Sequence, residues 1–292
     1  MPHNLIDDLV EASPNRRKFL KTIAAATAGV SALSMAGLKP AAAQTSTEVE
    51  VLQFALNLEY LEAEFYTYAL TGKGIEAHGI GTNGLANGSN PAGGGTTTGG
   101  HRVDFTEPFR AVSAPVAIQI GKDERAHVSL LRSALSSQVI AKPNLNLNAL
   151  GFGFGTQFEF MQLSRIFEDI GVSAYAGAAG LLTTPTIITT AARILAAEAE
   201  HVASIRTQIA ILRVPTTQLD AADLLPPPSG NEFSILSLAS TINGLVATRT
   251  PGEVLYLAFG NQANATTGGF FPCGVNGAIT ISSGPAPVTN LE

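Results

Sequence analysis

The chain has 292 residues, of which only 14% are charged, and it carries a formal net charge of −6 and a single cysteine. Charged residues usually make up about a quarter of a soluble chain, so this low content favours extensive burial, as in a homo-oligomer. The acidic balance and the lack of a basic cluster argue against nucleic acid as a partner. With Cys273 alone, an internal disulfide framework and a thiolate metal cluster are excluded.

Residues 1–43 are predicted to be a twin-arginine signal peptide rather than part of the fold. Residues 15–21 read NRRKFLK, which resembles the twin-arginine export motif, and an apolar run at 23–38 and the cleavage site Ala41-Ala42-Ala43 follow. The alternative is a membrane anchor, but this run is shorter than the roughly 20 residues needed to span a bilayer. We therefore expect export to the periplasm, with no stable membrane span after cleavage.

The first helix is predicted over residues 47–70. Its core-facing seam alternates spacings of four and three residues, as in a bundle helix, and comprises Leu52, Leu56, Glu59, Ala63, Tyr66 and Leu70. Glu59 is the only charged residue on this seam, which makes it a candidate ligand. Glu62 lies one turn further on and remains open, either as an alternative ligand or as a carboxylate behind the ligands.

A glycine-rich insertion at residues 73–112 separates the first two predicted helices. Connections of this length are uncommon, so we expect a lid, a binding loop or disorder. The insertion contains His78 and His101, which we expect to be solvated, since a histidine in a surface loop usually is.

The second helix is predicted over residues 114–138, with Ser113 as its cap and Pro115 in its first turn. It contains Glu124 and His127, which share one face because residues three apart on a helix do. A surface salt bridge is the alternative reading of the pair. That reading would leave two ionisable groups on the apolar face of the helix.

A crossover at residues 139–155 leads to predicted helices at 156–182 and 183–212, the latter with Thr184 as cap and Pro185 at its first position. The third helix has one seam residue every seven positions: Met161, Glu168, Tyr175 and Leu182. Glu168 is again the only charge on its seam. The fourth helix carries a second Glu-x-x-His pair, Glu198 and His201, so each half of the chain supplies the same residue types.

Residues 214–292 are predicted to form an irregular C-terminal extension. Residues 250–253 read TPGE, a capping box that opens a short helix through Phe259, and residues 277–283 favour a short strand. We expect Cys273 to be an inert small residue. The extension either packs across the helices or forms a partner surface.

The chain therefore carries a weak internal duplication, in which a lone glutamate is followed seven residues later by a tyrosine and then by a Glu-x-x-His helix. The two sets are Glu59, Tyr66, Glu124 and His127, and Glu168, Tyr175, Glu198 and His201. Four carboxylates and two imidazoles from four helices are the ligands of a di-metal site in a helical bundle. Four negative charges balance two divalent ions, and oxygen ligands favour iron, with manganese as the alternative. Each tyrosine would donate a hydrogen bond to a ligating carboxylate, relay single electrons, or fill the core.

These segments resemble the ferritin-like superfamily, which includes rubrerythrins and bacterioferritins, and the exported ferritin-like proteins related to plant desiccation-related proteins are the nearest look-alikes. The resemblance covers residues 47–213. It implies an all-α, ferritin-like four-helix bundle at 44–213, with the long insertion between its first two helices. It also implies an exported di-metal oxidase, peroxidase or ferroxidase linked to stress. The alternative is a non-catalytic, stress- or desiccation-associated structural or binding protein on the same bundle.

Overall fold

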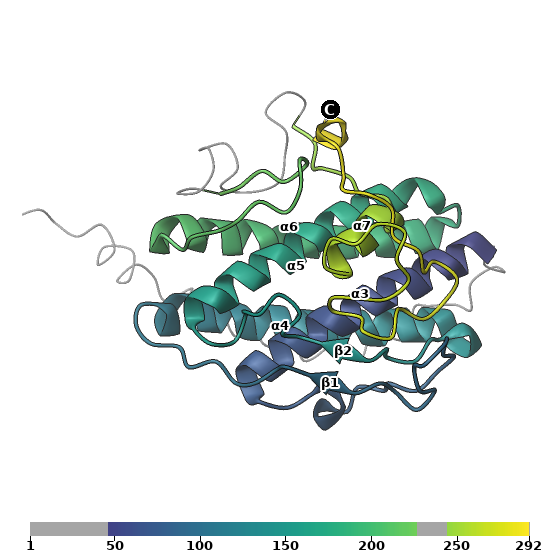
Figure 1. The fold of residues 1–292 in the computed structure, drawn as a ribbon, viewed down its shortest axis with the longest axis horizontal. Coiled ribbons are helices and arrows are strands. Elements are labelled where there is room, and N and C mark those ends of the chain that lie inside the picture. The colour runs from purple at the N-terminus through teal and green to yellow at the C-terminus, as the bar shows by residue number, and fades with distance from the viewer. Residues whose placement is uncertain (1–45, 227–243, 292) are drawn as a thin grey trace, which may run out of the picture. The chain divides into compact units, whose positions relative to one another are not determined.

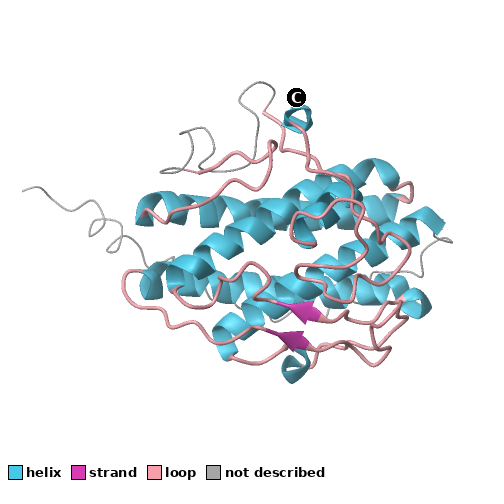
Figure 2. Cartoon of the chain, in the orientation of Figure 1, coloured by secondary structure: helices cyan, strands magenta, loops and turns pink. Residues whose placement is uncertain are grey.

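The computed structural model describes residues 46–226 and 244–291. The signal peptide predicted at 1–43 lies outside the described residues. Within them the fold is all-α: four long helices form a bundle, one short helix packs on it, and the only strands are two of two residues each (Figure 2). The predicted fold class is therefore confirmed. None of the described helices is long and apolar enough to cross a membrane.

The bundle consists of two antiparallel helix pairs stacked as two layers (Figure 1). One layer pairs α3 (Ser46–Thr71) with α4 (Phe109–Leu135), and the other pairs α5 (Gln157–Ala178) with α6 (Pro185–Leu212). Between the layers, α3 faces α5 and α4 faces α6, again in antiparallel pairs. Helices α4 and α5 therefore run in the same direction, so the segment between them has to travel the length of the bundle.

Helix α4 begins five residues earlier than predicted, at Phe109, with Pro108 at its N-cap position. Ser113 is therefore not a cap: it lies inside the helix and is 1% exposed. The prediction that Pro115 lies in the first turn is also wrong: it lies inside the helix, where it removes the hydrogen bond to the carbonyl of residue 111 without ending the helix. The helix ends at Leu135 and continues as a 3-10 turn, η2 (Ser136–Gln138).

The junction between α5 and α6 is short, as predicted. The Thr156 hydroxyl caps α5 by accepting a bond from the Glu159 amide at 3.1 Å. Helix α5 ends at Ala178, before the predicted Leu182, because a 3-10 turn, η3 (Ala179–Leu181), tightens its end. Thr184 occupies the N-cap of α6 but makes no capping bond with its side chain. Instead Glu48, from the first turn of α3, accepts bonds from the backbone amides of residues 183 and 184 at 2.7 and 2.5 Å.

The glycine-rich insertion is a packed segment that lies against the crossover rather than a free loop. It contains η1 (Ile75–His78) and β1 (Thr97–Thr98), which pairs in parallel with β2 (Leu145–Asn146) of the crossover. A Cβ at Gly84 or Gly95 would lie 2.4 or 2.3 Å from crossover backbone, so only glycine permits this approach. Its His78 and His101 are exposed, as predicted.

The described part of the C-terminal extension packs across the bundle. Its helix α7 (Pro251–Ala258) begins with the predicted capping box, although it ends one residue before Phe259, and it contacts α5. Asn276 exchanges backbone–side-chain bonds with Asn57 of α3 at 2.8 and 2.9 Å. The strand predicted at 277–283 is wrong: this segment has no regular strand, and its Ser282 donates a backbone bond to Ala265 at 2.9 Å and accepts one from Asn264 at 3.1 Å.

Candidate metal centre

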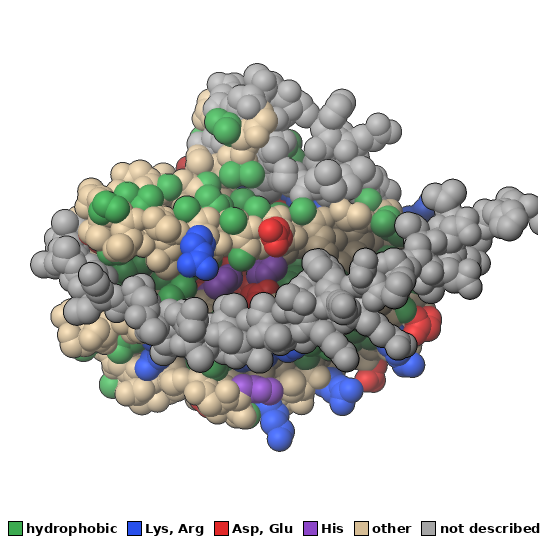
Figure 3. Space-filling view, turned by 180° about the vertical axis from the view of Figure 1, so that it is seen from behind, with side chains coloured by type: hydrophobic (Ala, Val, Ile, Leu, Met, Phe, Trp, Pro, Cys, Tyr) green, Lys and Arg blue, Asp and Glu red, His purple; other side chains and the backbone are tan. Residues whose placement is uncertain are grey.

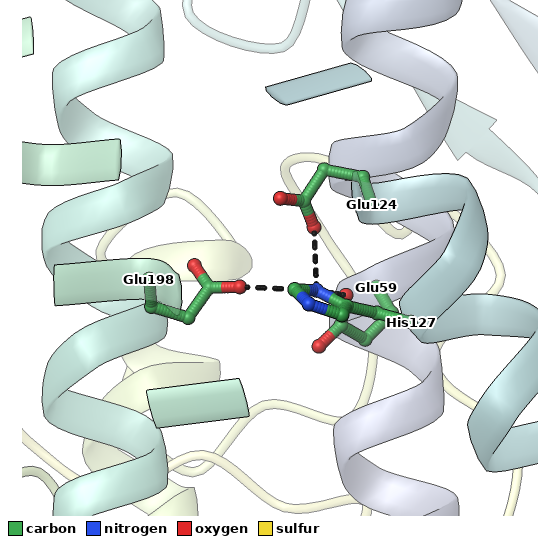
Figure 4. Close-up of side chains that lie close together, drawn as sticks. All are labelled: Glu59, Glu124, His127 and Glu198. Carbon is green, nitrogen blue, oxygen red and sulfur yellow. Dashed lines mark ion pairs between the residues drawn. The ribbon is translucent and has the colours of Figure 1, made fainter. Parts of the chain in front are cut away.

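Six ligand-type side chains from the four bundle helices converge on one buried position. All four carboxylates are fully buried and the two histidines are 8% and 7% exposed, and the six are Glu59, Glu124, His127, Glu168, Glu198 and His201. Figure 4 shows His127 extending between Glu124 and Glu198, with Glu59 beside it. On the face seen in Figure 3, histidine and acidic side chains come to the surface side by side.

The ligand atoms form two overlapping groups. In each group one atom per residue lies within 4.8 Å of every other; the first contains Glu59, Glu124, His127 and Glu198, and the second contains Glu124, Glu168, Glu198 and His201. Glu124 and Glu198 belong to both. Each histidine directs its Nδ1 atom at the carboxylates of its own group, at 3.3–3.4 Å for His127 and 3.1 Å for His201. The arrangement brings together two groups of possible ligands that share two carboxylates.

Half of the polar side-chain atoms of these six residues have no hydrogen-bond partner within the described part of the chain. Six of them are in this state: Glu59 Oε2, both oxygens of Glu124, His127 Nδ1 and both oxygens of Glu198. The contacts with His127 have ion-pair lengths but not hydrogen-bond directions. Burying an ionised carboxylate without a partner costs several kcal/mol or more, so such groups should bind a cation. The donor set of carboxylate oxygen and imidazole nitrogen fits divalent iron or manganese.

The sequence profile described as "Ferritin-like domain" matches residues 47–210, which is more than half of the chain. The chain belongs to the ferritin-like family. It is similar to the ferritin-like catalase Nec2 of Nesocodon mauritianus, with 24% identity over 80% of this chain and 84% of that protein. It is also similar to the desiccation-related protein PCC13-62 of Craterostigma plantagineum, with 27% identity over 55% of this chain and 52% of the relative. The second match therefore spans about half of the relative's length.

The two tyrosines of the duplication hydrogen-bond across the ferritin-like bundle. Tyr66 on α3 donates to Glu168 Oε1 on α5 at 2.5 Å, and Tyr175 on α5 donates to Glu59 Oε1 on α3. Each tyrosine thus holds the lone glutamate of the opposite half. Burial, and then the neighbouring carboxylates, raise the pKa of both tyrosines well above the usual value, so both keep their protons. Of the three roles considered for them, the structure supports the hydrogen-bonding one.

The structure adds one residue that the sequence did not single out. Asp123 on α4 lies 3.3 Å from Nε2 of His201 and accepts a bond from Gln119 at 2.8 Å. The other ring nitrogen of His201 faces the ligand group, so Asp123 orients the imidazole from behind, as outer carboxylates commonly do for ligating histidines. Sequence patterns could not identify Asp123 as a supporting residue, because it lies at the edge of the apolar seam and not on it. The equivalent position on α6 is Ala197, which has no carboxylate to offer His127, so this position supports His201 but not His127.

Glu62 is a fifth buried carboxylate, 5% exposed, but it is not in either ligand group. When the two halves are aligned on Glu59 and Glu168, Glu62 corresponds to Gly171 on α5. A Cβ on Gly171 would lie 3.3 Å from Glu62 Oε1 and 2.8 Å from Glu198 Oε2, so the missing side chain leaves room for both carboxylates. Of the two candidates on α3, the geometry therefore places Glu59 among the ligand atoms and Glu62 behind Glu198.

Protons occupy much of the metal-free cluster. Burial raises the pKa of Glu124 to about 7 and, together with the other carboxylates, raises the pKa of Glu62 and Glu198 well above their usual range. Burial alone would lower the pKa of both histidines, but the surrounding carboxylates raise it above the ordinary value. For Glu59, burial is the largest single influence and acts to raise the pKa. The charge of His127 and the hydrogen bonds from His127, Glu124 and Tyr175 together outweigh burial, so the pKa of Glu59 is lowered. Binding of a divalent ion here has to displace protons.

Proposed function

We propose that this ferritin-like protein is an exported di-metal enzyme that breaks down hydrogen peroxide, with two divalent ions, iron in the first place and manganese as the alternative. The observation that carries the proposal is the pair of overlapping four-residue groups that share Glu124 and Glu198. The similarity to a ferritin-like catalase supports peroxide as the substrate.

The six ligand-type residues would hold two ions. Glu59 and His127 would hold one ion, Glu168 and His201 the other, and Glu124 and Glu198 both. Two such ions supply reversible two-electron exchange with peroxide when bound. Two molecules of hydrogen peroxide yield two of water and one of oxygen, so no external reductant is required and no net proton is gained or lost.

The chain itself has to hold the protons that move during such a reaction. Glu62 keeps a proton because it is buried beside other carboxylates, and it lies next to Glu198. Tyr66 holds one oxygen of Glu168, whose second oxygen faces His201. Tyr175 holds one oxygen of Glu59, whose second oxygen faces His127. The four carboxylates are fully buried, so water screens their interactions little.

A non-catalytic role in desiccation or another stress is the second candidate. It is favoured by the similarity to a desiccation-related protein, which covers 55% of this chain. In that case the same carboxylate and histidine cluster would hold metal only to stabilise the bundle. The two candidates share the metal centre and differ in turnover.

The experiment that separates them uses the full chain purified before export and loaded with ferrous or manganous ions. Metal analysis and oxygen release from hydrogen peroxide are compared for the wild type, Glu198→Gln and Glu200→Gln. Glu200 is exposed on the same helix, so it is the matched control. We expect two ions per chain and oxygen release in the wild type and the control only. Two ions without oxygen release would favour the non-catalytic role, and no bound metal would refute both.

Export is a separate part of the proposal and has a separate test. It rests on Arg16 and Arg17 in a sequence that resembles the twin-arginine motif. The double change R16K/R17K should keep the protein in the cytoplasm, whereas the wild type should be processed after Ala43 and found outside it. Equal fractionation of the two proteins would contradict this route.

A further inference from the structure

A second polar position lies in the bundle core, further along the helices from the metal centre. It is a cavity of about 10 Å³ to which each bundle helix contributes one polar side chain: Tyr66 from α3, Ser113 from α4, Ser164 from α5 and Gln208 from α6. Apolar side chains such as Phe160 complete its wall. Tyr66 is the residue that the cavity shares with the metal centre, through its bond to Glu168.

Three of the four polar side chains have atoms without a partner among the described residues. These are Ser113 Oγ, Ser164 Oγ and Gln208 Oε1, in residues that are 1%, 1% and 6% exposed. The amide nitrogen of Gln208 does bond to Ser204 Oγ at 3.1 Å, which fixes the amide and leaves its oxygen facing the cavity. The Ser164 hydroxyl acts on Tyr66 so as to lower its pKa, but the two do not meet hydrogen-bond geometry. Leaving such a buried polar atom without a hydrogen bond destabilises the fold.

Ser113, Ser164 and Gln208 have no polar counterparts at the equivalent positions of the internal duplication. Counted from the paired glutamates, the positions equivalent to Ser164, Gln208 and Ser113 in the other half are Ala55, Ala134 and Ile187. All three are apolar. Apolar residues at these three positions would cost less free energy to bury than unbonded polar ones. The polar atoms therefore require a hydrogen-bonding ligand.

We propose that this cavity binds one water molecule that supports Tyr66, and through it the Glu168 side of the metal centre. A volume of about 10–15 Å³ and two to four polar partners are what a buried water requires. A water here accepts from the Ser113 and Ser164 hydroxyls and donates to Gln208 Oε1 and to the Tyr66 oxygen. Tyr66 has already given its own hydrogen to Glu168, so its oxygen is an acceptor. All four bonds of the water are then satisfied.

The water makes the two metal positions unequal. The group that contains Glu168 and His201 is supported through Tyr66 and the water, whereas the group that contains Glu59 and His127 has only Tyr175. This consequence rests on the proposed metal binding; the water itself does not. Loss of the water should therefore weaken one metal position and leave the other.

The first test is a crystal structure of the full chain at a resolution that shows ordered water. We expect a solvent peak within hydrogen-bond distance of Ser113 Oγ, Ser164 Oγ, Gln208 Oε1 and Tyr66 Oη. A cavity without a peak, or side chains that bond to one another across it, would overturn the proposal. This test holds whether or not the protein binds metal, so its failure and the failure of the proposed function are distinguishable.

The second test is calorimetric titration of the metal-free wild type, S113A/Q208L and Ser129→Ala with manganous ions. Ser129 is an exposed serine of α4 whose hydroxyl bonds only within its own helix, so it controls for the serine-to-alanine change. We expect about a tenfold loss of affinity at one of two positions in the double variant, the lower end of what outer partners contribute. Equal loss at both positions, or none, would contradict the link from the water to Glu168. If the double variant does not fold, Ser164→Ala replaces it.

Discussion

The bundle contains two buried clusters of charged side chains that differ in how their charges are matched. The metal centre has five carboxylates, including Glu62, against two imidazoles, and six of its atoms lack hydrogen bonds. The second cluster is on the other side of α5 and α6, where these helices meet the C-terminal extension. It has three arginines and three aspartates: Arg165, Arg206, Arg249, Asp169, Asp220 and Asp223.

In the second cluster, almost every charged atom has a partner. Asp169 accepts from Arg165 at 2.8 Å and from Arg206 at 2.7 Å, and Asp223 accepts from Arg165 at 2.9 Å. Arg249 binds Asp220 at 2.6 Å and also donates to the Ser173 hydroxyl at 2.8 Å. Arg165 Nε is the exception, with no partner within the described residues. These bonds fasten the extension to the bundle.

Buried charge has a different role in each of the two clusters. In the arginine and aspartate cluster, attraction between opposite charges offsets part of the free energy lost on desolvation. These ion pairs hold segments together, even where their net contribution to stability is small. Like-charged carboxylates without partners oppose folding until a cation arrives. Removing one charge should therefore have opposite effects on the stability of the metal-free protein in the two clusters.

The largest effect is expected from Asp169→Asn. The change leaves Arg165 and Arg206 with one charged partner fewer in a buried position. Breaking a buried pair in this way costs about 3–5 kcal/mol, so the free energy of unfolding should fall by that amount. Urea unfolding of the metal-free protein measures it. A loss below about 1 kcal/mol would show that this cluster does not hold the extension.

In the metal centre, Glu124→Gln should leave the metal-free protein at least as stable as the wild type. The change removes one of several repelling carboxylates and keeps the shape of the side chain. Metal affinity should fall by at least about 100-fold, because Glu124 belongs to both ligand groups and even outer partners contribute 10–100-fold. Urea unfolding and metal titration provide the two numbers. A strongly destabilised metal-free variant would remove the contrast between the clusters.

Tyr66→Phe and Tyr175→Phe should each weaken metal binding by about tenfold, since each removes a hydrogen bond to one ligating carboxylate. Both phenyl rings retain the packing of the core. Isothermal titration of the two variants provides the measurement, with Tyr256→Phe on α7 as a control outside the centre. Unchanged affinity in both variants would indicate that the tyrosines only fill space.

The smallest effect concerns pH. The pKa of Glu124 is raised from 4.5 to about 7, so the folded metal-free protein holds a proton that the unfolded chain releases. Stability from this group is complete below about pH 4.5 and is lost as the pH rises through about 7. The melting temperature of the metal-free protein should therefore fall as the pH rises through this range. Thermal melts should show a smaller slope for Glu124→Gln, and a rising slope would contradict the assignment.

Much of the architecture could be predicted from local patterns. Spacings of three, four and seven residues place side chains on one face of a helix whatever the helix packs against, so Glu59, Glu168 and both Glu-x-x-His pairs could be assigned to inward faces. Helix ends were predicted less well where a distant residue decides them. The start of α4 and the capping of α6 by Glu48 are two such cases.

The residues alone were enough to predict the helix class, the order of the helices and which polar groups face the core, because helical periodicity is a property of neighbouring residues. Three features could be seen only in the folded chain: Asp123 supports His201, Gly171 makes room for Glu62, and the glycine-rich insertion lies on the crossover. Each of these depends on the distance between segments far apart in the chain. No pattern within a single helix contains that distance.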